Sequence, residues 1–203
     1  MEFESPKNLI SLDPHIPIWD RVFTVAPLVV IGSKGSGGDD LAPKHMATPI
    51  GFGNYFGFVC TPRHCTYDNI EKTGLFSVSF PTPEQLVSIS LSATPSKEKY
   101  SKSETVVAAL PTIKANTMDI LMIEGAYLYL ECELFKIIDG FDDYSLITGH
   151  IRHVMVQEDY LKSSDRDENK QIREHPLLAY IANGRFATIT ETYNFPFPKD
   201  FQR

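Results

Sequence analysis

Strict alternation of side chains over residues 127–137 constrains the fold more than any other feature of the sequence. The two faces of an extended chain there would carry Leu128, Leu130, Cys132 and Leu134 on one side, and Tyr129, Glu131 and Glu133 on the other. Because strand side chains alternate with a period of two, the segment is predicted to be a β-strand with one core-facing side. Aromatic residues at 127, 129 and 135 share the opposite face, so we expect a second copy to cover it, with the chain's own helices or C-terminal tail as the alternative.

Similar strand signals recur along the chain. β-branched and aromatic residues are concentrated in residues 19–25, 27–33, 55–61, 75–80, 147–156 and 185–190. In one of these segments, residues 75–80, apolar side chains alternate with serines, as in a half-buried strand. Many strands without a strand–helix–strand rhythm predict a mainly β fold, an antiparallel barrel with a few short helices, and argue against a Rossmann fold.

Two short helices are predicted from the residues at their ends. Residues 66–73 have Thr66 as a candidate N-cap and Gly74 just beyond their last turn. Residues 82–93 begin with a capping box and a proline in the first helical position. Residues 97–102 are polar, so we expect them to be exposed.

The 203 residues fit one domain, since roughly 150 residues per domain is usual. We expect residues 1–203 to form a single domain with a core of about residues 20–190 and extensions at both ends. The charged residues 163–174 are expected to be a mobile loop or a short helix within it, not a linker.

Charge and cysteine content limit the partners and the compartment. The formal net charge of −7 argues against nucleic acid or an anionic membrane as the main partner. Three cysteines, an odd and sparse count, indicate reduced thiols in an intracellular compartment. No signal peptide is visible, and the longest apolar stretch, residues 26–31, is far shorter than the roughly 20 residues that span a bilayer. The expectation is a soluble, cytoplasmic protein.

The loop of residues 61–66 is the best candidate for an anion site. It joins the end of a predicted strand to the start of a predicted helix, where unpaired N–H groups and a partial positive charge favour phosphate. Arg63 and His64 add cationic donors, and Thr66 adds a hydroxyl. An exposed arginine beside a routine helix cap explains the same pattern about equally well.

Three other groups of residues are weaker candidates for a binding or metal site. The glycines between residues 32 and 38 lack dinucleotide-binding spacing and precede two aspartates, so a hairpin loop is the better interpretation. Cys60, His64 and Cys65 lack a nearby fourth ligand for zinc, so no metal site is expected. Alternation places His150 and His153 on opposite faces of one strand, which prevents them from sharing a metal.

The sequence between residues 40 and 80 resembles the flavin reductase-like, FMN-binding split-barrel family, including its flavoredoxin type. The specific part is a short helix-and-strand motif that matches Thr66, Asn69, Ile70, Thr73, Gly74, Phe76 and Val78. Two segments before it, residues 41–43 and 46–49, and the closing segment around residues 175–191 are similar as well. Two positions depart from the family pattern. Residues 53–56 read Gly-Asn-Tyr-Phe in place of a proline pair, and Ser79 stands where asparagine is common.

The resemblance implies an FMN cofactor and a hydride transfer to it from NADH or NADPH, with the protein supplying position and electrostatics. It implies a homodimer whose interface completes the flavin pocket, and it places His150 near the nicotinamide as an orienting residue. The cofactor-binding residues expected from the loop and the resemblance together are Met46, Ala47, Thr48, Pro49, Thr61, Arg63, His64, Thr66, Asn69 and Ser79. Two alternatives stay open, a non-catalytic flavin carrier or sensor and an enzyme similar to pyridoxamine phosphate oxidases.

Overall fold

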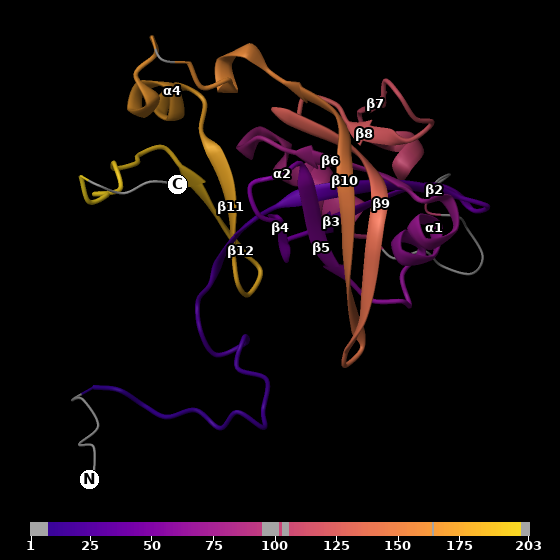
Figure 1. The fold of residues 1–203 in the computed structure, drawn as a ribbon, viewed down its shortest axis with the longest axis horizontal. Coiled ribbons are helices and arrows are strands. Elements are labelled where there is room, and N and C mark those ends of the chain that lie inside the picture. The colour runs from indigo at the N-terminus through magenta and orange to yellow at the C-terminus, as the bar shows by residue number, and fades with distance from the viewer. Residues whose placement is uncertain (1–7, 95–101, 103–105, 164, 200–203) are drawn as a thin grey trace.

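A seven-stranded antiparallel sheet forms the body of the protein (Figure 1). The computed structural model describes residues 8–94, 102, 106–163 and 165–199. The strand order is β3-β2-β6-β9-β10-β5-β4. The strands are β2 (Val29–Gly35), β3 (Gly38–Lys44), β4 (Ala47–Pro49), β5 (Tyr55–Cys60), β6 (Leu75–Phe80), β9 (Leu128–Phe141) and β10 (Tyr144–Val156).

The sheet is curled into a barrel that is split along one seam. Strands β3 and β4 lie at opposite ends of the strand order, yet only His45 and Met46 separate them in the sequence. The two edges must therefore approach each other at these two residues. This confirms the predicted fold class, a mainly β split barrel with short helices.

The inside of the curl is the main hydrophobic core. Leu130 and Cys132 of β9 are buried there, as their alternation predicted, and the rings of Phe58 and Phe76 pack edge to face at 5.5 Å. Gly149 of β10 crosses directly above Phe76. A Cβ atom at residue 149 would lie 2.5 Å from that ring, so glycine is required for this close approach.

The opposite face of the central strands is buried as well. A hairpin of β7 (Thr112–Lys114) and β8 (Leu121–Ile123) covers it, and Tyr129 donates a hydrogen bond to the Ile123 carbonyl at 3.0 Å. On β6, Ser77 donates to the Leu121 carbonyl at 2.9 Å, and both serines of that strand are fully buried. The strand predicted at residues 75–80 is confirmed by β6, but the expectation that it is half-buried is wrong, because the hairpin covers the serine side.

A separate small sheet has the order β1-β11-β12, formed by β1 (Val25–Pro27), β11 (Leu177–Ile181) and β12 (Arg185–Ile189). The strand expected at 185–190 is confirmed by β12. The strand expected at 19–25 is wrong, since only Val25 of that segment joins a strand, opposite Ile181. Residues 8–24 instead lead away from the barrel (Figure 1).

The helices are short and lie at the ends of strands. They are α1 (Cys65–Thr73), α2 (Leu86–Ser92), α4 (Glu168–Glu174) and the 3₁₀ turns η1 (Pro83–Gln85), η2 (Val107–Ala109) and η3 (Glu158–Tyr160). Gly74 ends α1 at a φ of 70°, as predicted. The capping box is also confirmed, because the Thr82 amide donates to Gln85 Oε1 at 2.8 Å. Within the described part of the chain, no helix has the length and apolar character needed to cross a membrane.

Two further expectations concern less regular segments. The glycine-rich stretch forms a tight β2–β3 hairpin in which Gly35 pairs with Gly38, so the hairpin interpretation is confirmed. The charged segment 163–174 contains α4 in its second half. Of the polar segment 97–102, only Lys102 lies within the described residues, and it is buried, contrary to the expectation of exposure.

Candidate functional site

An open pocket of about 290 Å³ lies at the N-terminus of α1, between β3 and the end of α2. Three residues predicted to bind an anion, Arg63, His64 and Thr66, line it. Its other lining side chains that bear on ligand chemistry are Asp40, Lys44, Cys65 and Lys102. Sequence reasoning missed both lysines, which come from the end of β3 and from a position far along the chain. The pocket thus unites three cations with a helix N-terminus.

The start of α1 faces this pocket without a capping side chain. His64 is the N-cap residue, and its side chain makes no cap hydrogen bond. The first amides of a helix have no partners within the helix and carry partial positive charge. Thr66 was expected to be the cap, which is wrong, because its hydroxyl donates to Asp40 Oδ2 at 2.6 Å. An anion bound here would accept hydrogen bonds from the first amides of α1, to which no capping side chain is bound.

A buried ion pair forms the floor of the pocket. Lys102 Nζ lies 3.0 Å from Asp40 Oδ1 and donates to the Leu41 carbonyl at 2.6 Å. Asp40 is thereby paired with a cation and with the Thr66 hydroxyl, which reduces the repulsion that a lone carboxylate would exert on a phosphate. The positively charged side chains that remain for a ligand at the opening of the pocket are Lys44 and Arg63.

Arg63 lies at the rim, where it forms an ion pair with Asp143 at 2.8 Å. Asp143 belongs to the turn between β9 and β10, and both partners are more than two-thirds exposed. Exposed pairs of this kind contribute about 0–1 kcal/mol. Arg63 can therefore leave Asp143 for an anion in the pocket at little cost in free energy.

His64 differs from the cationic donor that the sequence suggested. Partial burial lowers its pKa, and the nearby Lys44 and Lys102 lower it further against the opposing effect of Asp40. Its imidazole is therefore neutral around pH 7, and it can offer an N–H group but no full charge. Thr61 shapes the same loop, since its hydroxyl accepts a hydrogen bond from the Arg63 amide at 3.4 Å.

Strand β4 continues from the pocket along the seam of the barrel. Ala47, Thr48 and Pro49 pair with β5 on one side only, because β4 is the last strand in the order. Met46, just before it, is half exposed, and its carbonyl accepts a hydrogen bond from the Val59 amide at 2.8 Å. The outer edge of β4 thus offers backbone groups for a ligand next to the anion pocket. Two of the predicted binding segments, the loop at 61–66 and residues 46–49, are brought together.

Asn69 and Ser79 are not brought to the pocket. The Asn69 amide donates to the Ser33 hydroxyl at 3.2 Å, on the side of α1 that packs on β2. The Ser79 hydroxyl accepts from the Ile123 amide at 3.2 Å and is fully buried under the β7–β8 hairpin.

His150 lies outside the pocket, on the outer face of β10, with its ring 4.9 Å from the ring of Tyr55. It pairs with Glu133 across the strands, and His153 pairs with Glu131. These two glutamates are two residues apart and share a face, so both histidines lie on one face. The expectation of opposite faces is wrong, because an irregularity between residues 151 and 153 inserts Arg152 and shifts the alternation.

Solved structures share this fold. The chain has a TM-score of 0.72 and 21% identity to an FMN-binding protein from Thermus thermophilus with bound 1-cyclohex-2-enone, over 93% of this chain and 99% of that one. Flavoredoxin from Methanosarcina acetivorans gives a TM-score of 0.73 and 20% identity, over 95% and 97%. The 2-nitrobenzoate 2-nitroreductase of Pseudomonas fluorescens gives 0.73 and 19%, over 100% and 99%. No curated protein matches the chain.

The split antiparallel barrel and these structural likenesses show that the chain has the split-barrel fold of these proteins. The family model described as "Flavin reductase like domain" matches residues 22–190. The chain belongs to this family. Membership supports a flavin-related oxidoreductase, and it confirms the resemblance carried by the helix-and-strand motif.

Proposed function

We propose that this protein binds FMN and passes hydride from NADH or NADPH to it, as a flavin reductase or flavoredoxin-like oxidoreductase. The observation that carries the proposal is the pocket at the N-terminus of α1, where Lys44 and Arg63 flank a helix end without a side-chain cap, above the Asp40–Lys102 pair. Its chemistry suits a phosphate monoester, which needs several donors and positive charge.

The residues present fit FMN in two parts. The pocket volume of about 290 Å³ is at the low end for ligand sites, so it suits the phosphate and the adjoining chain, not the whole cofactor. Arg63, His64 and the amides of the first helical turn would hold the phosphate. The backbone of residues 46–49 would lie against the ring system at the edge of β4. Bound FMN supplies the hydride-accepting chemistry, and the chain holds and orients it.

His150 is proposed as a positioning residue for the nicotinamide. It lies on the outer face of the β5–β10 pair, beside Tyr55 and opposite Glu133 across the strands. An imidazole can orient the donor by a hydrogen bond without taking part in the transfer itself.

We also propose that the chain forms a single domain. Two copies would form a homodimer whose interface completes the flavin site. Phe135, on the same outer face as His150, is 63% exposed. A large aromatic side chain exposed beside Tyr55 is typical of a surface that another subunit covers.

Anaerobic reduction tests the function directly. Purified protein loaded with FMN should lose its flavin colour on addition of NADH or NADPH in the absence of oxygen. Yellow protein that neither nucleotide bleaches would favour a non-catalytic carrier or sensor. Protein that takes up no added FMN would exclude both.

A further inference from the structure

The first described residues of the chain form an apolar arm that contacts little of the body. Within this arm, residues 8–24, no residue is buried. Large hydrophobic side chains are exposed along it, including Ile10 at 86% and Phe23 at 81%. Removing so apolar a segment from water by covering it with another surface lowers the free energy of the protein.

The departure point of the arm is fixed. The Thr24 carbonyl accepts a hydrogen bond from the Ala182 amide at 3.1 Å, and Asp20 accepts one from Asn183 at 2.9 Å. These contacts hold the end of the arm against the β11–β12 turn, and from there the arm runs away from the barrel (Figure 1). Fully extended, its residues reach at most about 60 Å, which is enough to cross a second molecule.

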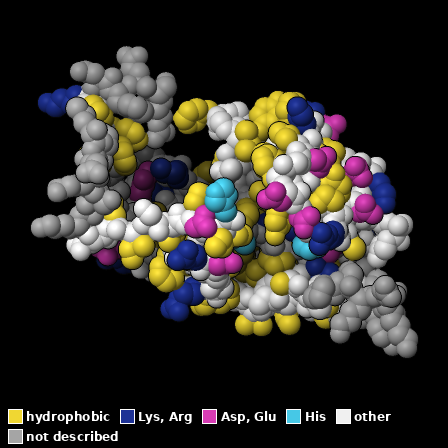
Figure 2. All heavy atoms as spheres, turned by 90° about the horizontal axis from the view of Figure 1, so that it is seen from below, with side chains coloured by type: hydrophobic (Ala, Val, Ile, Leu, Met, Phe, Trp, Pro, Cys, Tyr) yellow, Lys and Arg dark blue, Asp and Glu magenta, His cyan; other side chains and the backbone are white. Residues whose placement is uncertain are grey.

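A receiving surface of matching chemistry lies on the outer face of the barrel. We call it the outer patch, Tyr55, Val59, Phe135, Ile138 and Leu146. Leu146 of β10 is paired with Ile138 of β9 on one side and with Val59 of β5 on the other, so these three residues form one row across the strands. The ring of Phe135 lies 5.1 Å from the ring of Tyr55. Viewed from below, hydrophobic side chains are spread over much of the molecular surface between the charged ones (Figure 2).

The same chain carries both apolar surfaces, the arm with Ile10 and Phe23 exposed and the outer patch with Phe135 and Ile138 exposed. A second copy supplies both surfaces reciprocally, one arm for each patch, as two-fold symmetry requires.

We propose that the arm of each copy lies on the outer patch of a second copy, and this rests on the homodimer proposed above. His150 shares the face of the outer patch, so the exchanged arm would border the surface where the nicotinamide is proposed to bind. The arm of one copy would therefore form part of the border of the partner's nicotinamide site and would also stabilise the dimer.

Trp19 tests this directly, because it is the single tryptophan of the chain and lies in the arm. In the full-length protein, its emission should be at shorter wavelength when the protein is dimeric and should move to longer wavelength as dilution dissociates the dimer. The variant Phe135→Ser/Ile138→Ser should show the long-wavelength emission at concentrations where the wild type does not. The matched control Val87→Ser/Leu91→Ser removes exposed apolar side chains from α2 and should behave as wild type.

Light scattering and FMN titration on the same samples separate the possible failures. A dimer that binds FMN but keeps Trp19 exposed overturns the arm exchange alone. A monomer that binds FMN overturns the dimer together with the exchange. If the outer-patch substitutions leave the short-wavelength emission of Trp19 unchanged, the arm lies on another surface, and the proposed arm exchange is overturned.

Discussion

Asp40 and Lys102 form an ion pair of 3.0 Å in which both side chains are more than nine-tenths buried. The pair joins β3 to a distant part of the chain and forms the floor of the anion pocket. A buried pair of this kind makes each partner costly to remove alone, because the other charge is left without compensation.

Lys102→Met should lower the free energy of unfolding by about 3–5 kcal/mol. The double variant Asp40→Asn/Lys102→Met should lose clearly less than the sum of the two single changes, since no buried charge then remains. Urea unfolding of all four proteins measures the interaction energy. Strict additivity would show that the two groups do not interact.

Arg63→Ala should weaken FMN binding about ten- to a hundredfold, since charge-assisted hydrogen bonds contribute roughly 1.5–3 kcal/mol. Riboflavin lacks the phosphate, so its affinity should hardly change. Arg152→Ala is the matched control, because Arg152 forms a similar exposed ion pair with Glu133 outside the pocket. Equal losses for FMN and riboflavin, or none, would place the phosphate elsewhere.

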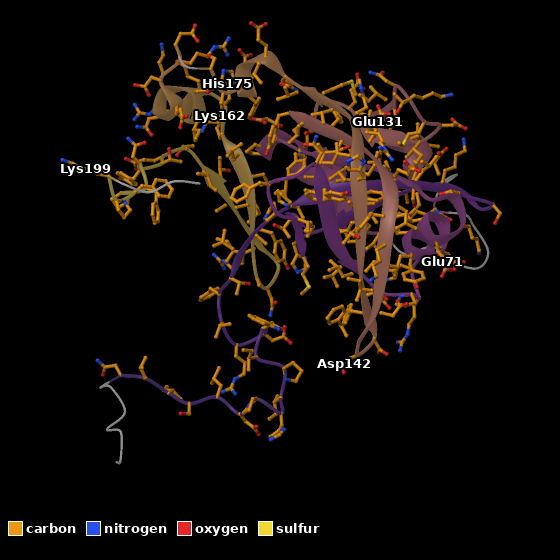
Figure 3. The ribbon with its side chains drawn as sticks, viewed as in Figure 1. Glu71, Glu131, Asp142, Lys162, His175 and Lys199 are labelled. Atoms are coloured by element: carbon orange, nitrogen blue, oxygen red, sulfur yellow. The ribbon has the colours of Figure 1, made fainter. Side chains whose placement is uncertain are left out.

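Glu131→Gln should destabilise the fold by about 1–3 kcal/mol. The Glu131 carboxylate is fully buried and accepts hydrogen bonds from the amides of Asn116 and Thr117 at 2.7 and 2.8 Å. An amide can replace only one of the two accepting oxygens. Figure 3 shows Glu131 on β9 near the β7–β8 hairpin, whose connecting turn these bonds hold. Glu133→Gln, two residues along and half exposed, should change stability by less than 1 kcal/mol in the same urea titration.

The same carboxylate predicts a dependence of stability on pH. Burial, the largest single influence, raises the pKa of Glu131, but the hydrogen bonds from Thr117 and Asn116 together outweigh it and lower the pKa. A folded-state pKa below the unfolded value gives stability that is present above the unfolded pKa and is lost as pH falls through the folded pKa. Between pH 6 and about pH 3, the wild type should therefore lose more stability than Glu131→Gln. Parallel curves would contradict the assignment.

Gly149→Ala should cost at least about 1–3 kcal/mol, because the added Cβ would lie 2.5 Å from the Phe76 ring in the closed core. Gly37→Ala is a matched control, since a Cβ there meets no atom within 4 Å. Thermal unfolding should show a lowered Tm for the first variant and little change for the second. A wild-type Tm for Gly149→Ala would mean that the core relaxes around the methyl group.

His150→Ala should raise KM for NADH or NADPH more than it lowers kcat, because the residue is proposed to orient the donor without taking part in the transfer. His153→Ala lies on the same face three residues along and should change neither constant. Steady-state kinetics with FMN-loaded protein measures both. The assignment fails if His150→Ala leaves kcat and KM unchanged.

Local patterns in the sequence determined the elements whose signals are short-range. Alternation over residues 127–137 predicted β9, Gly74 marked the end of α1, and the loop at 61–66 located one wall of the pocket. These succeed because strand periodicity, helix termination and capping depend on neighbours a few residues apart.

Only the tertiary structure decided what covers each face and which charges meet. The β7–β8 hairpin buries the serines of β6 and the glutamate of β9, although the alternation there indicates an exposed side. The irregularity beside Arg152 reverses the face of His153, and Lys102, from the segment between α2 and η2, is paired with Asp40 of β3. No local pattern encodes these contacts, because they depend on how the sheet closes on itself and on which distant segment then packs over it.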